Sequence, residues 1–401
     1  MIKLISKKPL SEVCEINPRD VNGLSSDSLI TFVPMSAVNE KTGSISTPEI
    51  RPYAKVVKGY TPFKDRDVLF AKITPCMENG KCAIAKNLEN GRGFGSTEFH
   101  ILRAGDKIIP EWVYFFLRQD EVRKFAANNM TGTAGQQRVP RSVFDRLLIP
   151  LPPLPVQKQI AAVLEKADAA REKRSQANQL TEQFLQSAFL EMFGDPITNP
   201  KGWNIVQFGD IVSSTKLGIV RGSSEQSSSF PLNYVKMNNI VGDGYLDLSN
   251  VTRVRASNHE VDEYSLRVGD FLFNTRNSLE LVGKTALFLR DGLYLFNNNI
   301  LRVRFLSSVR SEYINQLFQT RWIQHELDKR KSGTTSVFAI YYKELKTLPI
   351  MLPPYSEQER FAALVKKVES LRAKQLESEK ELGNLFQSLM QKAFKGELVK
   401  K

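Results

Sequence analysis

Residues 151–193 have the sequence LPPLPVQKQIAAVLEKADAAREKRSQANQLTEQFLQSAFLEMF, and residues 352–394 repeat it as LPPYSEQERFAALVKKVESLRAKQLESEKELGNLFQSLMQKAF. The two stretches align without a gap at an offset of 201 residues. Both begin with Leu-Pro-Pro-x-x-x-Gln and share an Ala-Ala pair and a Gln-Ser pair. An internal repeat of this quality determines how the rest of the chain is interpreted.

The repeat continues outside these stretches. Gly132-Thr133 matches Gly333-Thr334, Val33-Pro-Met35 matches Val235-Lys-Met237, and Leu69-Phe70 followed by Gly80-Lys81 recurs as Leu272-Phe273 followed by Gly283-Lys284. The 401-residue chain is long enough for two or three hydrophobic cores. We therefore predict four parts: a recognition domain at 1–153, a spacer helix at 154–199, a second recognition domain at 200–353 and a second spacer helix at 354–401.

The repeated stretches have the apolar spacing of long helices, with apolar or small residues three and four positions apart. Forty residues give a helix of about 60 Å, longer than a domain of this size needs for its own core. The apolar stripes are expected to pack against each other, and further apolar residues such as Leu180 and Leu185 are left for another partner. The candidates for helix pairing and the partner interface are Ile160, Val163, Phe184, Phe189, Phe361, Leu364, Leu382 and Leu385. A plain two-helix coiled coil without a partner is the alternative.

The other two segments are predicted to be α+β, with a β-rich core and long loops. Short apolar runs at 67–71 and 270–274 indicate strands. The stretches GRGFGST from Gly91 and GIVRGSSEQSSS from Gly218 are interpreted as turns and loops. Polar loops on a rigid framework commonly carry recognition residues.

Charge points to a polyanionic partner. The net charge is +13, and segments 1–153 and 200–353 contribute +6 and +5, whereas the first helix is slightly acidic. DNA is therefore expected on the two globular segments. Charge alone does not separate a DNA-binding protein from an ordinary basic protein.

Two stretches contain side chains suited to base recognition. TGTAGQQRVPR, residues 131–141, has amides and guanidiniums that can pair with adenine and guanine, and KSGTTSVF, residues 331–338, keeps its Gly-Thr but differs afterwards. Two such domains should recognise different short sequences. The DNA-binding candidates are Lys72, Thr74, Thr133, Gln136, Gln137, Arg138, Arg141, Arg221, Arg276, Asn277, Lys331, Thr334, Thr335 and Ser336. For each of them an ordinary surface role stays open.

Motifs for catalysis are weak. Leu352-Pro-Pro-Tyr355 lacks the amide or acid of an adenine methyltransferase loop, and Gly283-Lys284-Thr285 lacks the first glycine of a phosphate-binding loop. Three scattered histidines and three irregularly spaced cysteines predict neither a metal centre nor a disulfide framework. We expect no catalytic residue, no metal and no bound cofactor, and a cytoplasmic location without a membrane span.

Two variable basic domains, each followed by a Leu-Pro-Pro-x-x-x-Gln entry and a long helix, resemble the specificity subunit of a type I restriction-modification system. The resemblance implies two target-recognition domains held apart by an antiparallel helix pair, each recognising half of a bipartite double-stranded DNA site. It also implies two methyltransferase subunits using S-adenosylmethionine, and restriction subunits using ATP and magnesium. The alternative is a coiled-coil scaffold or adaptor with basic domains that bind RNA or protein. A monofunctional methyltransferase would need a cofactor loop that the sequence lacks.

Overall fold

The structure is a computed structural model that describes residues 6–19, 24–133, 135–333 and 336–398. The chain divides into two compact units. Unit 1 comprises residues 1–175 and 377–401, and unit 2 comprises residues 176–376. The division passes through the middle of both long helices, so the predicted boundaries between recognition domains and helices stay a prediction.

In its described residues, unit 1 has a two-stranded antiparallel sheet of β1 and β10 and two four-stranded sheets. One sheet has the strand order β2-β9-β6-β7 and is antiparallel throughout, and the other has the order β4-β3-β8-β5, in which β3 and β8 are parallel. The elements are β1 (Lys7–Pro9), α1 (Leu10–Val13), β2 (Cys14–Ile16), β3 (Leu29–Val33), β4 (Glu49–Pro52), β5 (Thr61–Lys64), β6 (Val68–Ala71), β7 (Cys82–Ile84), β8 (Arg92–Gly95), β9 (Phe99–Ala104), α2 (Pro110–Leu117), α3 (Asp120–Asn128) and β10 (Leu148–Pro150).

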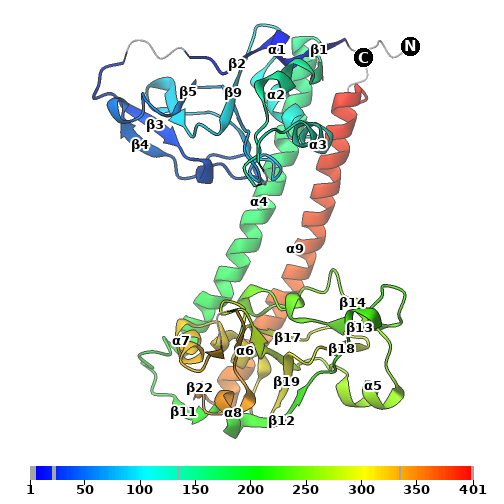
Figure 1. The fold of residues 1–401 in the computed structure, drawn as a ribbon. Coiled ribbons are helices and arrows are strands. Elements are labelled where there is room, and N and C mark those ends of the chain that lie inside the picture. The colour runs from blue at the N-terminus through cyan, green and yellow to red at the C-terminus, as the bar shows by residue number, and fades with distance from the viewer. Residues whose placement is uncertain (1–5, 20–23, 134, 334–335, 399–401) are drawn as a thin grey trace. The chain divides into compact units, whose positions relative to one another are not determined.

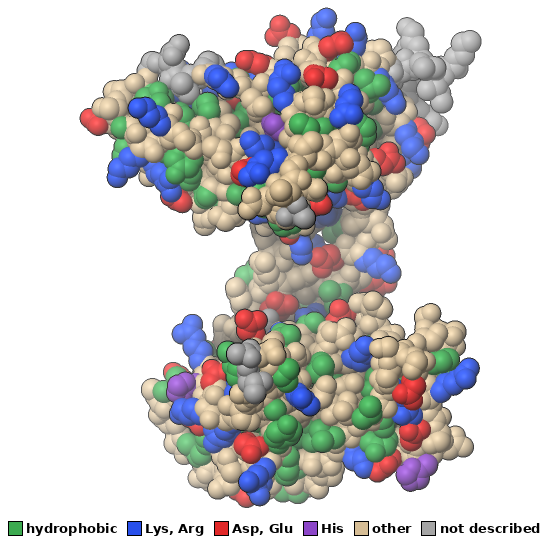
Figure 2. All heavy atoms as spheres, viewed as in Figure 1, with side chains coloured by type: hydrophobic (Ala, Val, Ile, Leu, Met, Phe, Trp, Pro, Cys, Tyr) green, Lys and Arg blue, Asp and Glu red, His purple; other side chains and the backbone are tan. Residues whose placement is uncertain are grey.

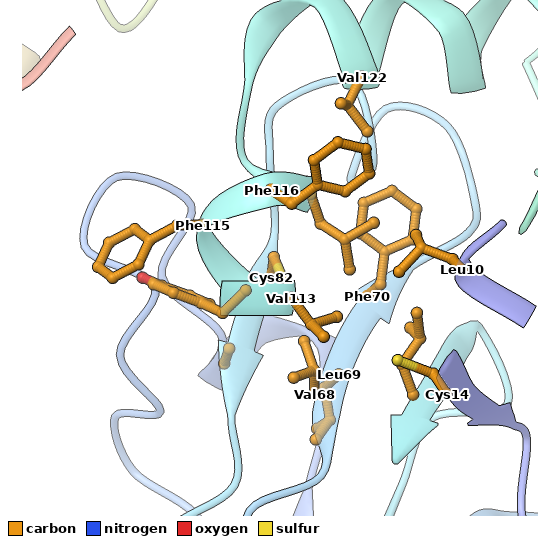
Figure 3. Packing of buried hydrophobic residues seen from close by; sticks show 14 of the residues in the cluster. Leu10, Cys14, Val68, Leu69, Phe70, Cys82, Val113, Phe115, Phe116 and Val122 are labelled. Carbon is orange, nitrogen blue, oxygen red and sulfur yellow. The ribbon is translucent and has the colours of Figure 1, made fainter. Parts of the chain in front are cut away.

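The main core of unit 1 lies between the sheet of β6 and the helices α2 and α3. All four residues of β6 are buried, because both faces of this central strand are covered. Figure 3 shows Val113 and Phe116 of α2 and Val122 of α3 packed with Phe70 of β6. Two free cysteines, Cys14 and Cys82, belong to the same core, and burial raises the pKa of each thiol to about 12.

Unit 2 repeats this arrangement (Figure 1). Its sheet β12-β19-β15-β17 corresponds to β2-β9-β6-β7, and a second sheet has the order β14-β13-β18. The elements are β11 (Asn204–Gln207), β12 (Val212–Leu217), β13 (Leu232–Val235), β14 (Thr252–Val254), α5 (Asn258–Tyr264), β15 (Phe271–Asn274), β16 (Arg276–Asn277), β17 (Thr285–Leu287), β18 (Tyr294–Phe296), β19 (Ile300–Phe305), α6 (Ser311–Phe318), α7 (Arg321–Asp328), β20 (Ser332–Gly333), β21 (Phe338–Ala339), α8 (Tyr342–Leu345) and β22 (Pro349–Leu352).

These elements confirm the predicted α+β class and the strands at β6 and β15. One local prediction is wrong, because residues 92–95 of the GRGFGST stretch form the strand β8 instead of a turn. Its glycines make room for Phe63 on the neighbouring strand β5, since a Cβ atom at Gly93 would lie 2.3 Å from the Phe63 ring. In the described part of the chain, the helices include none with the length and hydropathy of a membrane span.

The two long helices are α4 (Leu154–Phe193) and α9 (Tyr355–Lys395). In unit 2 they run antiparallel, because Gln375 donates to Thr181 at 3.0 Å while Phe361, earlier in α9, packs on Phe189, later in α4. In unit 1, Arg171 of α4 lies 4.5 Å from the ring of Phe386 near the end of α9.

The buried face of these helices differs from the predicted one at three positions. Ile160, Phe189 and Phe361 are buried, and Leu364 and Leu382 are half-buried. Pairing was wrongly predicted for three residues that are 39–51% exposed, while the next residue in the chain is buried instead; the exposed residues are Val163, Phe184 and Leu385, and the buried ones are Leu164, Leu185 and Phe386. The reason is that each part of a long helix also packs against the globular part of the unit to which it belongs, as Phe189 does on Tyr313 of α6 in unit 2.

A buried glutamine fixes the start of each long helix to its unit. Gln157 is fully buried, donates to the carbonyls of Pro152 and Lys107, and accepts from the backbone N–H of Ile109. Gln358, its counterpart in the repeat, donates to Pro353 and accepts from Arg310 N–H. Both side chains satisfy backbone groups that would otherwise be buried without a partner, which explains the glutamine in the repeated Leu-Pro-Pro-x-x-x-Gln sequence.

Candidate nucleic-acid interface

In unit 1, the segment that follows β6 lies beside a hairpin formed by the predicted recognition stretch. Thr131 and Arg138 exchange backbone hydrogen bonds of 2.9 and 2.8 Å, which close the hairpin. Gln137 C=O accepts from Thr74 N–H, and Lys72 C=O accepts from Val139 N–H. The structure therefore brings together the candidates on both sides of the hairpin.

The side chains at this edge differ in how available they are. Thr133, Gln136 and Arg141 are exposed, and Lys72, Thr74 and Gln137 are half-buried. In the described residues Arg141 has no ion pair or hydrogen bond from its side chain. Exposed amide and guanidinium groups on a hairpin can reach base edges or phosphates.

Arg138 is already engaged within the chain. Its Nε and Nη2 donate to the Glu98 carboxylate at 2.9–3.2 Å, and Nη1 donates to the carbonyl of Gln136. The bonds to Glu98 raise the pKa of Arg138 above its ordinary value. Arg138 thus holds the hairpin in shape in the free protein, a role that its sequence context did not reveal.

His100 lies beneath this edge and supports it. Its Nε2 lies 2.7 Å from the carbonyl of Val139, and its Nδ1 lies 3.2 Å from the Asn17 side-chain amide. Burial lowers the pKa of His100, and the positive charges of Lys72 and Arg141 lower it further. The imidazole is therefore neutral at physiological pH and donates from Nε2. Since Lys72 and Arg141 both act on this ring, the two cations lie near the same point of the edge.

Unit 2 has the equivalent hairpin. β20 pairs with β21, and β21 also pairs with β16, so that Arg276 lies opposite Ala339. Arg276 and Ser336 are exposed, and Asn277 is half-buried. Lys331 lies at the base of the hairpin, where its ammonium group contacts Asp328 at 2.7 Å and the Leu279 carbonyl. The candidates Thr334 and Thr335 lie outside the described residues.

Among the described residues, Arg221 forms no hydrogen bond or ion pair with the other candidates of unit 2. Its guanidinium donates to Glu260 at 2.6 Å and to the carbonyls of Arg255 and Val220, and its side chain is only 14% exposed. The hydrogen bond from Arg221 is the main reason why the pKa of Glu260 falls to about 2. Acidic and carbonyl oxygens therefore occupy the donors of Arg221 in the free protein, and its role as a DNA contact stays a prediction.

Two acidic residues at the unit 1 edge were not predicted. Glu98 binds Arg138, and Glu78 accepts from the Thr74 hydroxyl. Nothing in the linear sequence indicates either pairing, because the partners of Glu98 come from a different part of the fold. Figure 2 shows Lys and Arg side chains over the visible faces of both units, with Asp and Glu side chains among them. The excess positive charge is thus distributed, and local pairing decides which cations are free.

Comparison with known proteins identifies the same domain in both halves of the chain. A family model described as the type I restriction modification DNA specificity domain matches residues 4–182 and 200–383. The specificity subunits of the type I restriction enzymes EcoEI and EcoAI from Escherichia coli are 37% and 40% identical over 158 and 152 residues. These matches cover 39% and 38% of this chain, and this chain spans only 26% of either relative. The EcoKI specificity subunit from Escherichia coli K12 is 25% identical over 321 residues, or 75% of this chain and 68% of that protein.

Solved structures share the fold over nearly the whole chain. A chain from a structure of type I R-M system assembly and conformational transition is 25% identical, with a TM-score of 0.52 and coverage of 98% of both chains. The S subunit of a type I restriction-modification system from M. genitalium has a TM-score of 0.59 at 12% identity, covering 97% of this chain and 96% of that one. The second likeness shows the fold alone.

Proposed function

Because the chain belongs to the family of type I restriction modification DNA specificity domains, we propose that it recognises a bipartite DNA sequence through two hairpins, one in each unit. Unit 1 uses the hairpin closed by Thr131 and Arg138, and unit 2 uses the hairpin of β20 and β21. The residue classes fit this role, since amides and guanidiniums discriminate bases and hydroxyls bind phosphates.

One observation carries the proposal: two repeats of one fold place the same backbone hairpin beside the segment that follows a buried strand, with different side chains on it. Unit 1 presents Gln136 and Arg141, and unit 2 presents Arg276 and Ser336. Recognition of two independent half-sites requires a framework that is repeated in both units and carries different exposed side chains in each. An RNA- or protein-binding scaffold would not need a matched pair of hairpins.

The proposal is tested by mapping methylated sites in cells that express the chain with its methyltransferase partner. Replacing Gln136 and Gln137 together by alanine should relax one half of the target, and Arg276→Ala should relax only the other half. A matched control, Ser142→Ala just outside the hairpin, should leave the target unchanged. If either hairpin variant alters both halves, the units are not independent recognition domains.

We place catalysis in partner subunits: methyltransferase subunits that bind S-adenosylmethionine, and restriction subunits that use ATP and magnesium. The specificity subunits named above belong to restriction enzymes, which supports a multisubunit assembly. Each unit offers exposed apolar residues of the long helices to such a partner. In unit 1 these include Val163 and Leu385, and in unit 2 they include Leu180, Phe184 and Leu371. Phe184→Asp should weaken methyltransferase binding in co-purification without changing the DNA affinity of the chain itself.

The helices are also proposed to set the spacing between the half-sites. Removing seven residues from each helix, at positions related by the 201-residue offset, shortens each by about 10 Å, or roughly three base pairs of DNA. The spacer of the methylated target should then shorten, and an unchanged spacer would exclude this role.

A further inference from the structure

Unit 2 contains a cavity of about 1060 Å³ bounded by α6, α9, the end of α4 and the loop that contains Gly244 and Tyr245. Apolar side chains such as Leu185 and Val365 form part of its wall, and Glu369 of α9 lies in it half-buried. In the described residues Glu369 makes no hydrogen bond and no ion pair. A carboxylate in such a position lacks the partner that buried charges normally have.

The repeat shows what occupies the same place in unit 1. Asp168 of α4 is the counterpart of Glu369, and it pairs with Arg118 at 3.3 Å and with Arg171 at 2.8 Å. Arg118 also donates to the Tyr114 hydroxyl and to the carbonyl of Thr42. The Arg118 guanidinium therefore links α2 to α4 and to the loop that contains Thr42 in unit 1. The Arg118 side chain is only 9% exposed.

Unit 2 has lost this guanidinium. The residue 201 positions beyond Arg118 is Gln319, whose amide donates to Thr285 and to the Asn315 carbonyl instead of to an acid. Arg372, the counterpart of Arg171, stacks 3.1 Å from the ring centre of Tyr245 and pairs with Glu182. Neither side chain forms a hydrogen bond or an ion pair with Glu369. Burial raises the pKa of Glu369, and the charges of Arg372 and of Arg290, which also lines the cavity, only partly oppose this rise.

Smaller side chains in unit 2 also leave the space that unit 1 fills. Tyr114 and Phe115 of α2 correspond to Asn315 and Gln316, and Phe386 corresponds to Leu185. The loop that contains Gly43 approaches α2 in the same way as the loop that contains Gly244 approaches α6. Both glycines have positive φ values, 67° and 81°, and they lie against Tyr114 in unit 1 and Asn315 in unit 2. The cavity is therefore a vacated side-chain site and not an irregular gap between domains.

We propose that this cavity binds a guanidinium group on an apolar stem, which supplies to Glu369 the cation that Arg118 supplies to Asp168. The group is either a free guanidinium compound or an arginine of a bound polypeptide. Leu185 and Val365 contact the stem, and the Glu369 carboxylate accepts the paired N–H groups. The residues that line the cavity include none of the hairpin residues, so we expect its occupation to be independent of the proposed DNA recognition.

The test is calorimetric titration of the full chain with agmatine and with N-(4-aminobutyl)urea, which keeps the stem and the ammonium group of agmatine but replaces its guanidinium by a neutral urea. An acetyl-Gly-Arg-Gly-amide peptide is compared with its citrulline form in the same way. Agmatine or the arginine peptide should bind saturably, and the two urea analogues should bind roughly ten- to hundredfold more weakly. A peptide that binds more than tenfold tighter than agmatine identifies a polypeptide arginine, and equal affinities identify a free guanidinium compound. Absence of saturable binding by both cations overturns the proposal.

Two variants give the controls. Glu369→Gln removes the charge without removing any bond seen in the structure, so it should fold normally and lose the same ten- to hundredfold of affinity. Gln319→Arg restores the arginine of unit 1 and should block the cavity from within. Unchanged agmatine affinity in Glu369→Gln overturns the proposal, even if Gln319→Arg does not fold. DNA binding measured on the same samples should not change.

Discussion

Glu98→Gln should tighten non-specific DNA binding by freeing Arg138. In the structure the Glu98 carboxylate accepts three hydrogen bonds from Arg138 at the hairpin of unit 1. A glutamine of the same shape removes the negative charge and weakens the hold on the guanidinium. The chain should stay folded, because the pair is partly solvent-exposed and such pairs contribute little to stability.

The size of the effect follows from counterion release. Each additional cation that contacts a phosphate makes the slope of log K against log salt concentration steeper by about 0.9. If Arg138 gains one phosphate contact, the affinity of the variant relative to the parent rises by about eightfold for each tenfold decrease in salt. The change in slope is the better readout, because a change in affinity at one salt concentration has several causes.

The assay is fluorescence anisotropy with a duplex lacking the target, over a range of salt concentrations. Glu78→Gln is the matched control, because the Glu78 carboxylate lies at the same edge but accepts from the hydroxyl of Thr74 and forms no ion pair within the described part of the chain. Its slope should stay that of the parent chain. An unchanged slope in Glu98→Gln, or an equal increase in Glu78→Gln, would show that Arg138 does not become available to DNA.

Three further outcomes are expected. Arg276→Ala should make the salt slope shallower by about 0.9 in the same anisotropy assay. Arg221→Ala should leave the slope unchanged and destabilise unit 2 by about 1–2 kcal/mol, because it removes bonds to Glu260 and two carbonyls. Equal slopes for both variants would contradict this expectation. Gln157→Leu should destabilise unit 1 by about 3 kcal/mol and Gln358→Leu should destabilise unit 2 by about 2 kcal/mol, since three and two hydrogen bonds are lost. Hydrogen exchange of peptides from each unit measures both losses of stability. A larger loss for Gln358→Leu would show that the number of hydrogen bonds does not determine the effect. The pKa of His100 is lowered in the folded chain, so the unfolded chain takes up the proton first as the pH falls. The stability that neutral His100 contributes is therefore lost below about pH 6.5. His100→Gln should make the melting temperature depend less on pH in that range, and an unaltered pH profile would disprove this role of His100.

The sequence predicted the repeat and the long helices, because each depends on local pattern or on self-similarity. It did not predict that the two recognition stretches form hairpins, which the structure shows. The buried face of the helices was predicted one residue out of phase at Val163 and Phe184. A helix with apolar residues at neighbouring positions has two possible buried faces, and periodicity does not choose between them. The globular part of each unit makes that choice, because Leu164 and Leu185 enter its core.

Contacts between distant segments account for the other differences. Gly93 is part of a strand because Phe63 packs over it, although its neighbours suggest a turn. Arg221 follows a glycine- and serine-rich pattern typical of an exposed loop, yet Glu260 binds it. The pairing of Arg138 with Glu98 is likewise set by the sheet that brings them together. Free cations at the interface can be identified only after such pairs are known.

The two hydrophobic cores place a limit on gene shuffling in this family. Unit 1 is completed by the last turns of α9, where Phe394 packs on Trp112 at 4.3 Å and Phe386 packs near Phe115 at 6.3 Å. A chimera that exchanges only the first 150 residues joins a foreign aromatic cluster to the resident C-terminal helix. Natural or engineered exchange of specificity should therefore succeed when the incoming half keeps aromatic residues at these two positions of α2, and produce unstable hybrids when it does not.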